Sequence, residues 1–311
     1  MQKAYRPTMH RVVLVLACAS ACVGAHAQDA SALNTGQEQA VEQPLGSSGK
    51  LLLTGGVSQV EGSAGGGLAP WAVIGGYGTR DQIGGNAYYT RVEVGDYRLH
   101  SYGALVGLYD RVELSMSRQE FDTRQVGARL GLGRGFTIKQ DTYGLKVRLF
   151  GDAVLEQDRW LPQVSVGVQH KRNQEGALLA AIGAKDDSGT DFYVSATKLY
   201  LDRNLLLNAT VRFTQANQFG ILGFGGDRHD GYRPQLEASA AYLVTRTLAV
   251  GAEYRSKPDN LDIAAEDDAY DVFVAWAPLK HVSLTVAYVD LGNIVIRDHQ
   301  RGVYASLQIG F

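Results

Sequence analysis

The sequence predicts an all-β fold, an antiparallel up-and-down transmembrane β-barrel of about fourteen strands, with twelve to sixteen compatible, after a cleaved signal peptide. Three observations indicate this class. Apolar and polar residues alternate from residue 50 to the end, long and short connections alternate between the predicted strands, and an export signal opens the chain. The 37 glycines and only 7 prolines among 311 residues agree with many strands and tight turns.

Residues 1–27 predict a signal peptide. Lys3, Arg6 and Arg11 form a positive segment, the apolar run VVLVLACASACVGA follows, and AHA at 25–27 is a small-x-small cleavage site before Gln28. The apolar run is too short to cross about 30 Å of hydrocarbon as a helix. We therefore expect an exported protein.

Both cysteines, Cys18 and Cys22, lie in this signal, so the mature chain is expected to form no disulfide and no thiolate metal site. A lipoprotein signal acylated at Cys22 is an alternative. The whole chain has 30 basic and 32 acidic residues, and losing three basic residues with the signal gives 27 − 32 = −5. This balance argues against nucleic acid as a partner, because nucleic acid requires a basic patch.

Residues 28–49 are small and polar and predict a flexible periplasmic tail, whereas 50–311 are the expected barrel domain. The segment HVSLTVAYVDL at 281–291 illustrates the alternation. One face carries Val282, Leu284, Val286 and Tyr288, and the other Ser283, Thr285 and Ala287. No helical period is evident after residue 50. The predicted strands cover 51–60, 68–79, 83–94, 97–108, 111–119, 141–151, 161–172, 190–201, 204–215, 234–244, 247–257, 270–278, 281–291 and 301–311.

The connections between these strands differ in length in a regular order. Those at 121–140, 173–189, 216–233, 258–269 and 291–300 are long, whereas those near Asp110 and at 201–203, 244–247 and 278–280 are short, with 152–160 intermediate. Outer-membrane barrels have long extracellular loops and short periplasmic turns. The predicted location is therefore the outer membrane of a Gram-negative bacterium, with lipid and lipopolysaccharide as partners.

Aromatic residues near the strand ends agree with two interfacial belts. Trp160, Tyr200, Tyr242 and Trp276 come near the predicted periplasmic ends, and Tyr254, Tyr270 and Tyr288 near the outer ends.

The last predicted strand, RGVYASLQIGF, alternates apolar residues and ends in Phe311. Because a barrel has no free edge, its first and last strands must pair. By resemblance to outer-membrane proteins, this terminal strand looks like the signal that the barrel-assembly machinery reads. A strand of a soluble sandwich is the alternative.

Three segments together resemble a known family: GGVSQVEGSAGGGLAPWAVIGGYG (55–78), LPQVSVGVQHK (161–171) and DFYVSATKLYL (191–201). They resemble the proteobacterial outer-membrane proteins grouped as domain of unknown function 3034, and are distantly similar to outer-membrane proteins linked to exopolysaccharide production. The resemblance implies a barrel and its location but no catalytic residue.

The alternation directs several charged residues toward the lumen of the predicted barrel. These are Arg111, Glu113, Lys146, Arg148, Arg212, Glu237, Glu253 and Arg255. Such groups must meet water or one another, because unpaired buried charges are costly. The set fits a passive porin-like channel for small hydrophilic solutes. The alternative is a non-conducting accessory or structural barrel whose lumen is closed by loop 121–140 or loop 216–233. This alternative includes a link to exopolysaccharide production.

No enzyme activity, cofactor or metal site is expected. The pair His281 and Ser283 has the spacing of outer-membrane phospholipases but lacks their flanking motif. The acidic loop PDNLDIAAEDDAYD at 258–271 offers oxygen ligands suited to calcium or magnesium, yet its spacing matches no EF-hand, so a solvated loop is expected. The Gly-rich EGSAGGGLAP at 61–70 lacks the Gly-Lys-Ser/Thr ending of a phosphate loop.

Overall fold

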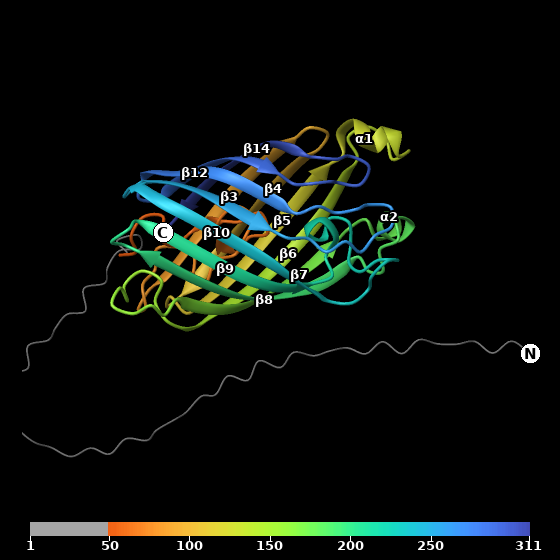
Figure 1. Cartoon of the computed structure of the whole chain (residues 1–311). Helices are drawn as coiled ribbons and strands as arrows, with labels where there is room; N and C mark the ends of the chain where they lie inside the picture. The colour runs from red at the N-terminus through yellow and green to blue at the C-terminus, as the bar shows by residue number, and fades with distance from the viewer. Residues whose placement is uncertain (1–48) are drawn as a thin grey trace, which may run out of the picture. The chain divides into compact units, whose positions relative to one another are not determined.

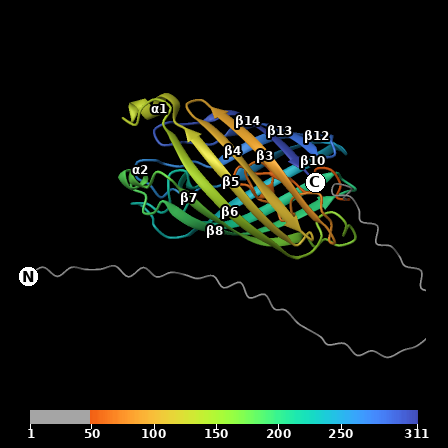
Figure 2. The ribbon, with the colours of Figure 1, turned by 180° about the vertical axis from the view of Figure 1, so that it is seen from behind.

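The computed structural model describes residues 49–311 as a closed antiparallel barrel of twelve strands, β3 to β14, in which β14 pairs with β3 (Figures 1 and 2). The predicted signal peptide, and the predicted tail apart from Gly49, lie outside these residues. None of the helices within 49–311 is long and apolar enough to cross a membrane. The barrel strands are β3 (Ile83–Val94), β4 (Arg98–Leu108), β5 (Val112–Asp122), β6 (Thr137–Phe150), β7 (Gln163–Asn173), β8 (Ser188–Tyr200), β9 (Leu205–Thr214), β10 (Arg233–Thr245), β11 (Leu248–Arg255), β12 (Ala269–Leu279), β13 (Val282–Asp290) and β14 (Arg301–Gly310).

The two faces of each strand follow the two-residue period of the sequence. On β13, Leu284 is 36% exposed on the outside of the barrel, whereas the next residue, Thr285, is 3% exposed on the inside. On β14, Val303 and Leu307 face outward and Tyr304 faces inward. The outer face is thus largely apolar and the inner face largely polar, as a wall between lipid and a polar interior requires.

The two ends of the barrel differ in the length of their connections. The short-turn end, where β14 ends, has turns at 109–111, 201–204, 246–247 and 280–281 and the longer connection 151–162. The long-loop end has loops 123–136, 174–187, 215–232, 256–268 and 291–300 and one short turn at 95–97. Three short helices lie in these loops, α1 (Arg124–Arg129), α2 (Gly176–Ala181) and η1 (Asn217–Gly220), and each is too short to show a period in the sequence.

Exposed aromatic residues occur near both ends of the outer face. Tyr242 and Trp276, each 48% exposed, lie toward the short-turn end. Tyr254, Tyr270 and Tyr288 are exposed toward the long-loop end. Their positions agree with the predicted belts.

The prediction of fourteen strands was wrong by two, because the first two predicted strands are not part of the wall. Residues 49–82, which we call the plug, precede the first barrel strand, and their central part, 57–78, runs inside the ring of strands (Figure 1). Every residue from 57 to 78 is buried, whichever its parity. The only strands in the plug are β1 (Val57–Ser58) and β2 (Ala64–Gly65), each of two residues, which pair as a hairpin. Its chain turns at Gly56, Gly62 and Gly76, whose positive φ angles of 70°, 99° and 78° interrupt an extended strand.

Candidate functional site

The wall supplies hydrogen-bond partners to the irregular backbone of the plug. Ala72 donates its N–H to Thr197 Oγ1 at 2.7 Å, and its carbonyl accepts from Gln163 Nε2 at 2.7 Å. The carbonyl of Pro70 accepts from Thr210 Oγ1 at 2.8 Å. Buried backbone groups without partners cost free energy, so a chain with little secondary structure needs such side chains around it. The polar inner face of the barrel is therefore complementary to the plug.

An ion pair between two wall residues binds two separate segments of the plug. Lys146 Nζ lies 3.1 Å from a Glu113 carboxylate oxygen, and both side chains are 1% exposed. Glu113 accepts the N–H groups of Ala64 at 3.0 Å and Gly75 at 2.8 Å. Lys146 donates to the carbonyls of Ala64 at 2.9 Å and Val73 at 3.0 Å. Two wall residues thus fix segments of the plug that are about ten residues apart in sequence.

A second wall carboxylate, Glu253, binds the glycine-rich part of the plug. It accepts the N–H groups of Gly67 at 2.5 Å and Leu68 at 2.7 Å, and the hydroxyl of Ser239 at 2.7 Å. A Cβ atom on Gly66 would lie 1.9 Å from Glu253 Oε1. Any larger residue at this position would force the Glu253 carboxylate away from its hydrogen bonds to the plug.

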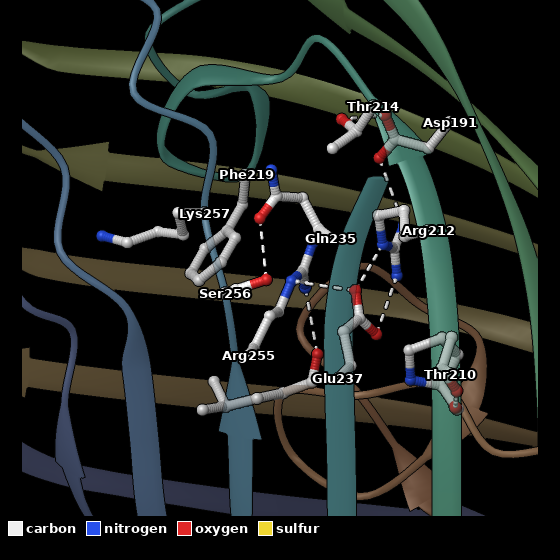
Figure 3. A network of polar contacts seen from close by, with 12 residues as sticks. Asp191, Thr210, Arg212, Thr214, Phe219, Gln235, Glu237, Arg255, Ser256 and Lys257 are labelled. Atoms are coloured by element: carbon white, nitrogen blue, oxygen red, sulfur yellow. Dashed lines mark hydrogen bonds and ion pairs between the residues drawn. The ribbon is translucent and has the colours of Figure 1, made fainter. Parts of the chain in front are cut away.

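Five consecutive wall strands, β7 to β11, each contribute one charged residue to a row of alternating sign that we call the charge belt. Its members are Lys171, Asp191, Arg212, Glu237 and Arg255, all at most 3% exposed. Asp191 lies 2.7 Å from Lys171 and 3.1 Å from Arg212, and Glu237 lies 2.5 Å from Arg212 and 3.3 Å from Arg255. Figure 3 shows Arg212 between the two carboxylates. The belt alone carries three positive and two negative charges.

Glu61 of the plug supplies the third negative charge. Its two carboxylate oxygens accept from Arg255 at 2.8 and 3.1 Å, and one of them lies 3.7 Å from Arg212. Lys171 also pairs with Glu61. The side chain of Glu61 is 0% exposed. Charges buried this deeply must be balanced by charges of opposite sign. Glu61 of the plug therefore neutralises the single excess positive charge of the charge belt.

Loop 215–232 enters the barrel from the long-loop end, where residues 216–226 are all buried. The carbonyl of Phe219 accepts from Gln140 Nε2 and from Lys171 Nζ, each at 3.2 Å. The ring of Phe219 lies 4.1 Å from the guanidinium of Arg255 (Figure 3). The predicted loop 216–233 therefore closes the lumen, whereas residues 128–135 of the other candidate loop, 121–140, are largely exposed. Lys171 and Arg255 contact both the plug and this loop.

A buried acid joins loop 256–268 to the inserted loop. Glu266 Oε1 accepts the N–H of Gln218 at 2.7 Å, and Glu266 Oε2 lies 3.7 Å from Lys257 Nζ. Burial raises the pKa of Glu266 to about 7, while the neighbouring Lys257 opposes the rise. Burial likewise lowers the pKa of Lys257. We therefore expect this contact to change with pH near neutrality.

Three other acids of this predicted acidic loop have protein partners. Asp259 and Asp262 pair with Arg228, and Asp268 accepts from the Tyr254 hydroxyl. Within residues 49–311, no group of three or more His, Cys, Asp or Glu side chains is placed to hold a metal ion.

Two small cavities lie beside the plug inside the barrel. One cavity, lined by Gly66, Gly67 and Thr285 among others, has a volume of about 30 Å³, and another, lined by Val60 and Phe219 among others, is also about 30 Å³. A space of this size holds about one water molecule. Larger hollows of about 280 and 840 Å³ lie beside Lys50 and Leu51, where the plug enters.

Most of the predicted lumen-facing residues lie inside the barrel. Those buried are Glu113, Lys146, Arg148, Arg212, Glu237, Glu253 and Arg255. Arg111 does not belong with them, because it is exposed in the turn between β4 and β5 and donates to the carbonyls of Arg148 and Leu149. The turn residues Tyr109 and Asp110 have positive φ, which ends the alternation one residue before β5 begins.

Sequence reasoning missed several buried charged residues of the barrel interior, among them Lys171, Asp191 and Glu61. Lys171 and Asp191 continue the inward parity of Gln169 and Tyr193, so the alternation of their strands contained the signal. No such signal marked Glu61 in the sequence, because buried and exposed residues do not alternate along the plug.

Phe311, the predicted assembly signal, lies at the short-turn end, as does the pair His281 and Ser283. Phe311 is 42% exposed, and one of its oxygens accepts from Tyr77 N at 2.9 Å and Gly85 N at 3.0 Å, which joins the last residue to both plug and β3. His281 Nδ1 lies 2.8 Å from the Gly310 carbonyl, and Ser283 is buried.

The fold and its contents define a twelve-stranded antiparallel barrel with an internal plug. The chain belongs to the family described as "Protein of unknown function (DUF3034)", which matches residues 54–308. A search of curated proteins gave no match.

Solved barrels with similar folds are remote in sequence. The KdgM porin is 10% identical, with 73% of this chain and 99% of that chain covered and a TM-score of 0.47. The NanC porin is 9% identical, with 74% and 98% covered and a TM-score of 0.45. Outer membrane phospholipase A from Escherichia coli is 12% identical, with 73% and 92% covered and a TM-score of 0.40.

Proposed function

We propose that this protein is an outer-membrane barrel that is closed at rest and serves as an accessory or structural protein of the cell envelope. One observation carries the proposal: residues 57–78 of the plug and residues 216–226 are buried inside the barrel, and two cavities beside the plug are about 30 Å³ each. A hydrophilic solute larger than water does not fit such a space. The apolar outer face supports the membrane location, with the short-turn end toward the periplasm. A link to exopolysaccharide production stays a prediction.

A second candidate is the porin-like channel for small hydrophilic solutes, opened when the plug withdraws. It is favoured by the way the barrel closes. Strands β14 and β3 pair directly, from Gly302 with Val94 to Gly310 with Asn86, and the plug contributes no strand to the wall. Withdrawal of the plug would therefore leave the hydrogen-bonded ring intact.

Conductance of the purified protein in planar bilayers separates the two candidates. We expect the full chain to be silent at rest and a variant lacking residues 50–78 to give discrete ohmic steps. Frequent steps from the full chain would contradict closure. Silence from both proteins would favour the structural role and assign the remaining obstruction to loop 215–232.

We further propose outer-membrane lipid, lipopolysaccharide and the barrel-assembly machinery as partners, and no nucleic acid. Phe311 is the proposed assembly signal. Phe311→Asp is expected to lower the heat-modifiable folded fraction more than Val41→Asp does, because Phe311 is hydrogen-bonded to both the plug and β3. Equal folded fractions would contradict this role.

No catalytic role is proposed for His281 and Ser283. The His281 Nδ1 atom lies next to the Gly310 carbonyl, and the His281 ring packs edge-on against Tyr77, 6.3 Å away. A general base also needs access to a substrate. The packing of this histidine against the plug supports a structural role, and hydrolysis of phospholipid by the purified protein would contradict it.

A further inference from the structure

The carboxylate of Glu61 is held by three cations that all belong to the wall. Arg255 contacts both of its oxygens at 2.8 and 3.1 Å, Arg212 lies 3.7 Å away, and Lys171 pairs with it. We propose that Lys171, Arg212 and Arg255 form a carboxylate-binding site in the wall, which Glu61 occupies in the closed barrel and a carboxylate-bearing solute occupies when Glu61 is absent. The proposal rests on the plugged state proposed above.

The site is built by the wall independently of the plug. Its three cations lie on β7, β9 and β11, and the intervening strands β8 and β10 carry Asp191 and Glu237. Asp191 contacts Lys171 and Arg212, and Glu237 contacts Arg212 and Arg255. These contacts restrain the three cations through residues of the wall alone. The cations therefore keep wall partners when the plug carboxylate is removed.

Aromatic rings flank the two guanidinium groups. Phe219 lies 4.1 Å from the Arg255 guanidinium, and Tyr193 lies 5.3 Å from that of Arg212. A ring over a guanidinium face restricts its plane while its N–H edge stays available. A fixed N–H fork matches the two oxygens of a carboxylate, which a spherical anion lacks. The geometry thus favours a carboxylate over chloride.

The net charge of the charge belt indicates the charge of the ligand group. Three positive and two negative residues of the belt leave one positive charge, and Glu61 cancels it. A monocarboxylate in place of Glu61 restores the same neutrality, whereas a neutral amide does not. A second negative charge would exceed the balance. The ligand group is therefore a single carboxylate.

The test uses the full chain with Glu61→Ala. This change removes the CγH₂ group and the carboxylate, so acetate matches the missing atoms, and acetamide matches their shape without the charge. We expect acetate to raise the urea midpoint of unfolding of Glu61→Ala in a saturable way, while equal concentrations of acetamide or chloride give no saturable rise. Glu61→Gln is the matched control under conditions where protease resistance shows that its plug is docked, because it then loses the charge but leaves no space. Neither Glu61→Gln nor the wild type should respond specifically to acetate.

Equal effects of acetate, acetamide and chloride on Glu61→Ala would overturn the proposal, as would an equal acetate response of Glu61→Gln. If Glu61→Ala does not fold in chloride, the folded fraction recovered on refolding in acetate or acetamide replaces the midpoint, and equal recoveries overturn the proposal. A conducting wild type would refute the closed state but leave this binding result unchanged, so the two failures are distinguishable.

Discussion

Replacing Glu61 by glutamine tests whether charge balance holds the plug in the barrel. The amide keeps the shape of the side chain but removes its charge. Lys171, Arg212 and Arg255 then face only Asp191 and Glu237, and one buried positive charge is left without a partner. We expect the plug to bind the wall more weakly.

The magnitude follows from the burial of Glu61, which is 0% exposed. Removing one partner of a buried ion pair costs about 3–5 kcal/mol. Since about 1.4 kcal/mol is a factor of ten in an equilibrium constant, the ratio of undocked to docked plug should rise by about two to four orders of magnitude. Glu93 offers a matched surface control, because it also pairs with arginines, Arg91 and Arg98, but its side chain is 38% exposed. An exposed pair contributes about 0–1 kcal/mol, so Glu93→Gln should change docking little.

A double variant isolates the role of charge. Glu61→Gln with Lys171→Gln removes one charge of each sign and restores neutrality of the belt. We expect its cost to be smaller than the sum of the single costs by about 0.5–3 kcal/mol. Opening frequency in planar bilayers and protease cleavage within the plug report docking, and urea unfolding reports the barrel. A double variant that undocks as much as or more than the sum would refute the charge-balance argument.

Three further outcomes are expected. Val286 lies at the middle of β13 and is 54% exposed, so Val286→Arg should lower the free energy of unfolding in lipid by about 2–4 kcal/mol. The control Leu279→Arg, at the end of β12, should lower it by only about 0–1 kcal/mol. Equal losses would contradict a lipid-facing wall. Gly66→Ala should displace the plug and increase its protease cleavage, because the added Cβ lies 1.9 Å from a carboxylate oxygen, whereas Gly231→Ala meets no atom within 4 Å and should behave as wild type. Because burial raises the pKa of Glu266 from 4.5 to about 7, its stabilising contribution is complete below pH 4.5 and is lost as the pH rises through about 7. Hydrogen exchange of residues 216–226, corrected for intrinsic rates, should therefore increase over this range in the wild type and much less in Glu266→Gln; the same slope in both would remove Glu266 as the cause.

The sequence predicted the wall closely because the wall obeys a local rule. Strand β3 was predicted at its observed bounds, 83–94, and the other eleven barrel strands begin and end within four residues of their predicted positions. Side-chain parity follows from backbone geometry alone, so Leu284 and Thr285 could be assigned to opposite faces without knowing their neighbours. The same parity placed Arg212, Glu237 and Arg255 inside the barrel.

What lies inside that wall was decided only by the tertiary structure. The plug was predicted as two strands, because local sequence does not say whether an extended glycine-rich segment joins a sheet or lies within it. Its Glu61 pairs with Lys171, 110 residues away, and with Arg255, 194 residues away. No local sequence period indicates either contact, because each forms only when the strands close around the plug. The sequence by itself determined the alternating wall and its polar interior through the two-residue geometry of a strand. Only closure of the barrel decided that this interior binds the chain's own backbone and one carboxylate, because the groups that pair come together only in three dimensions.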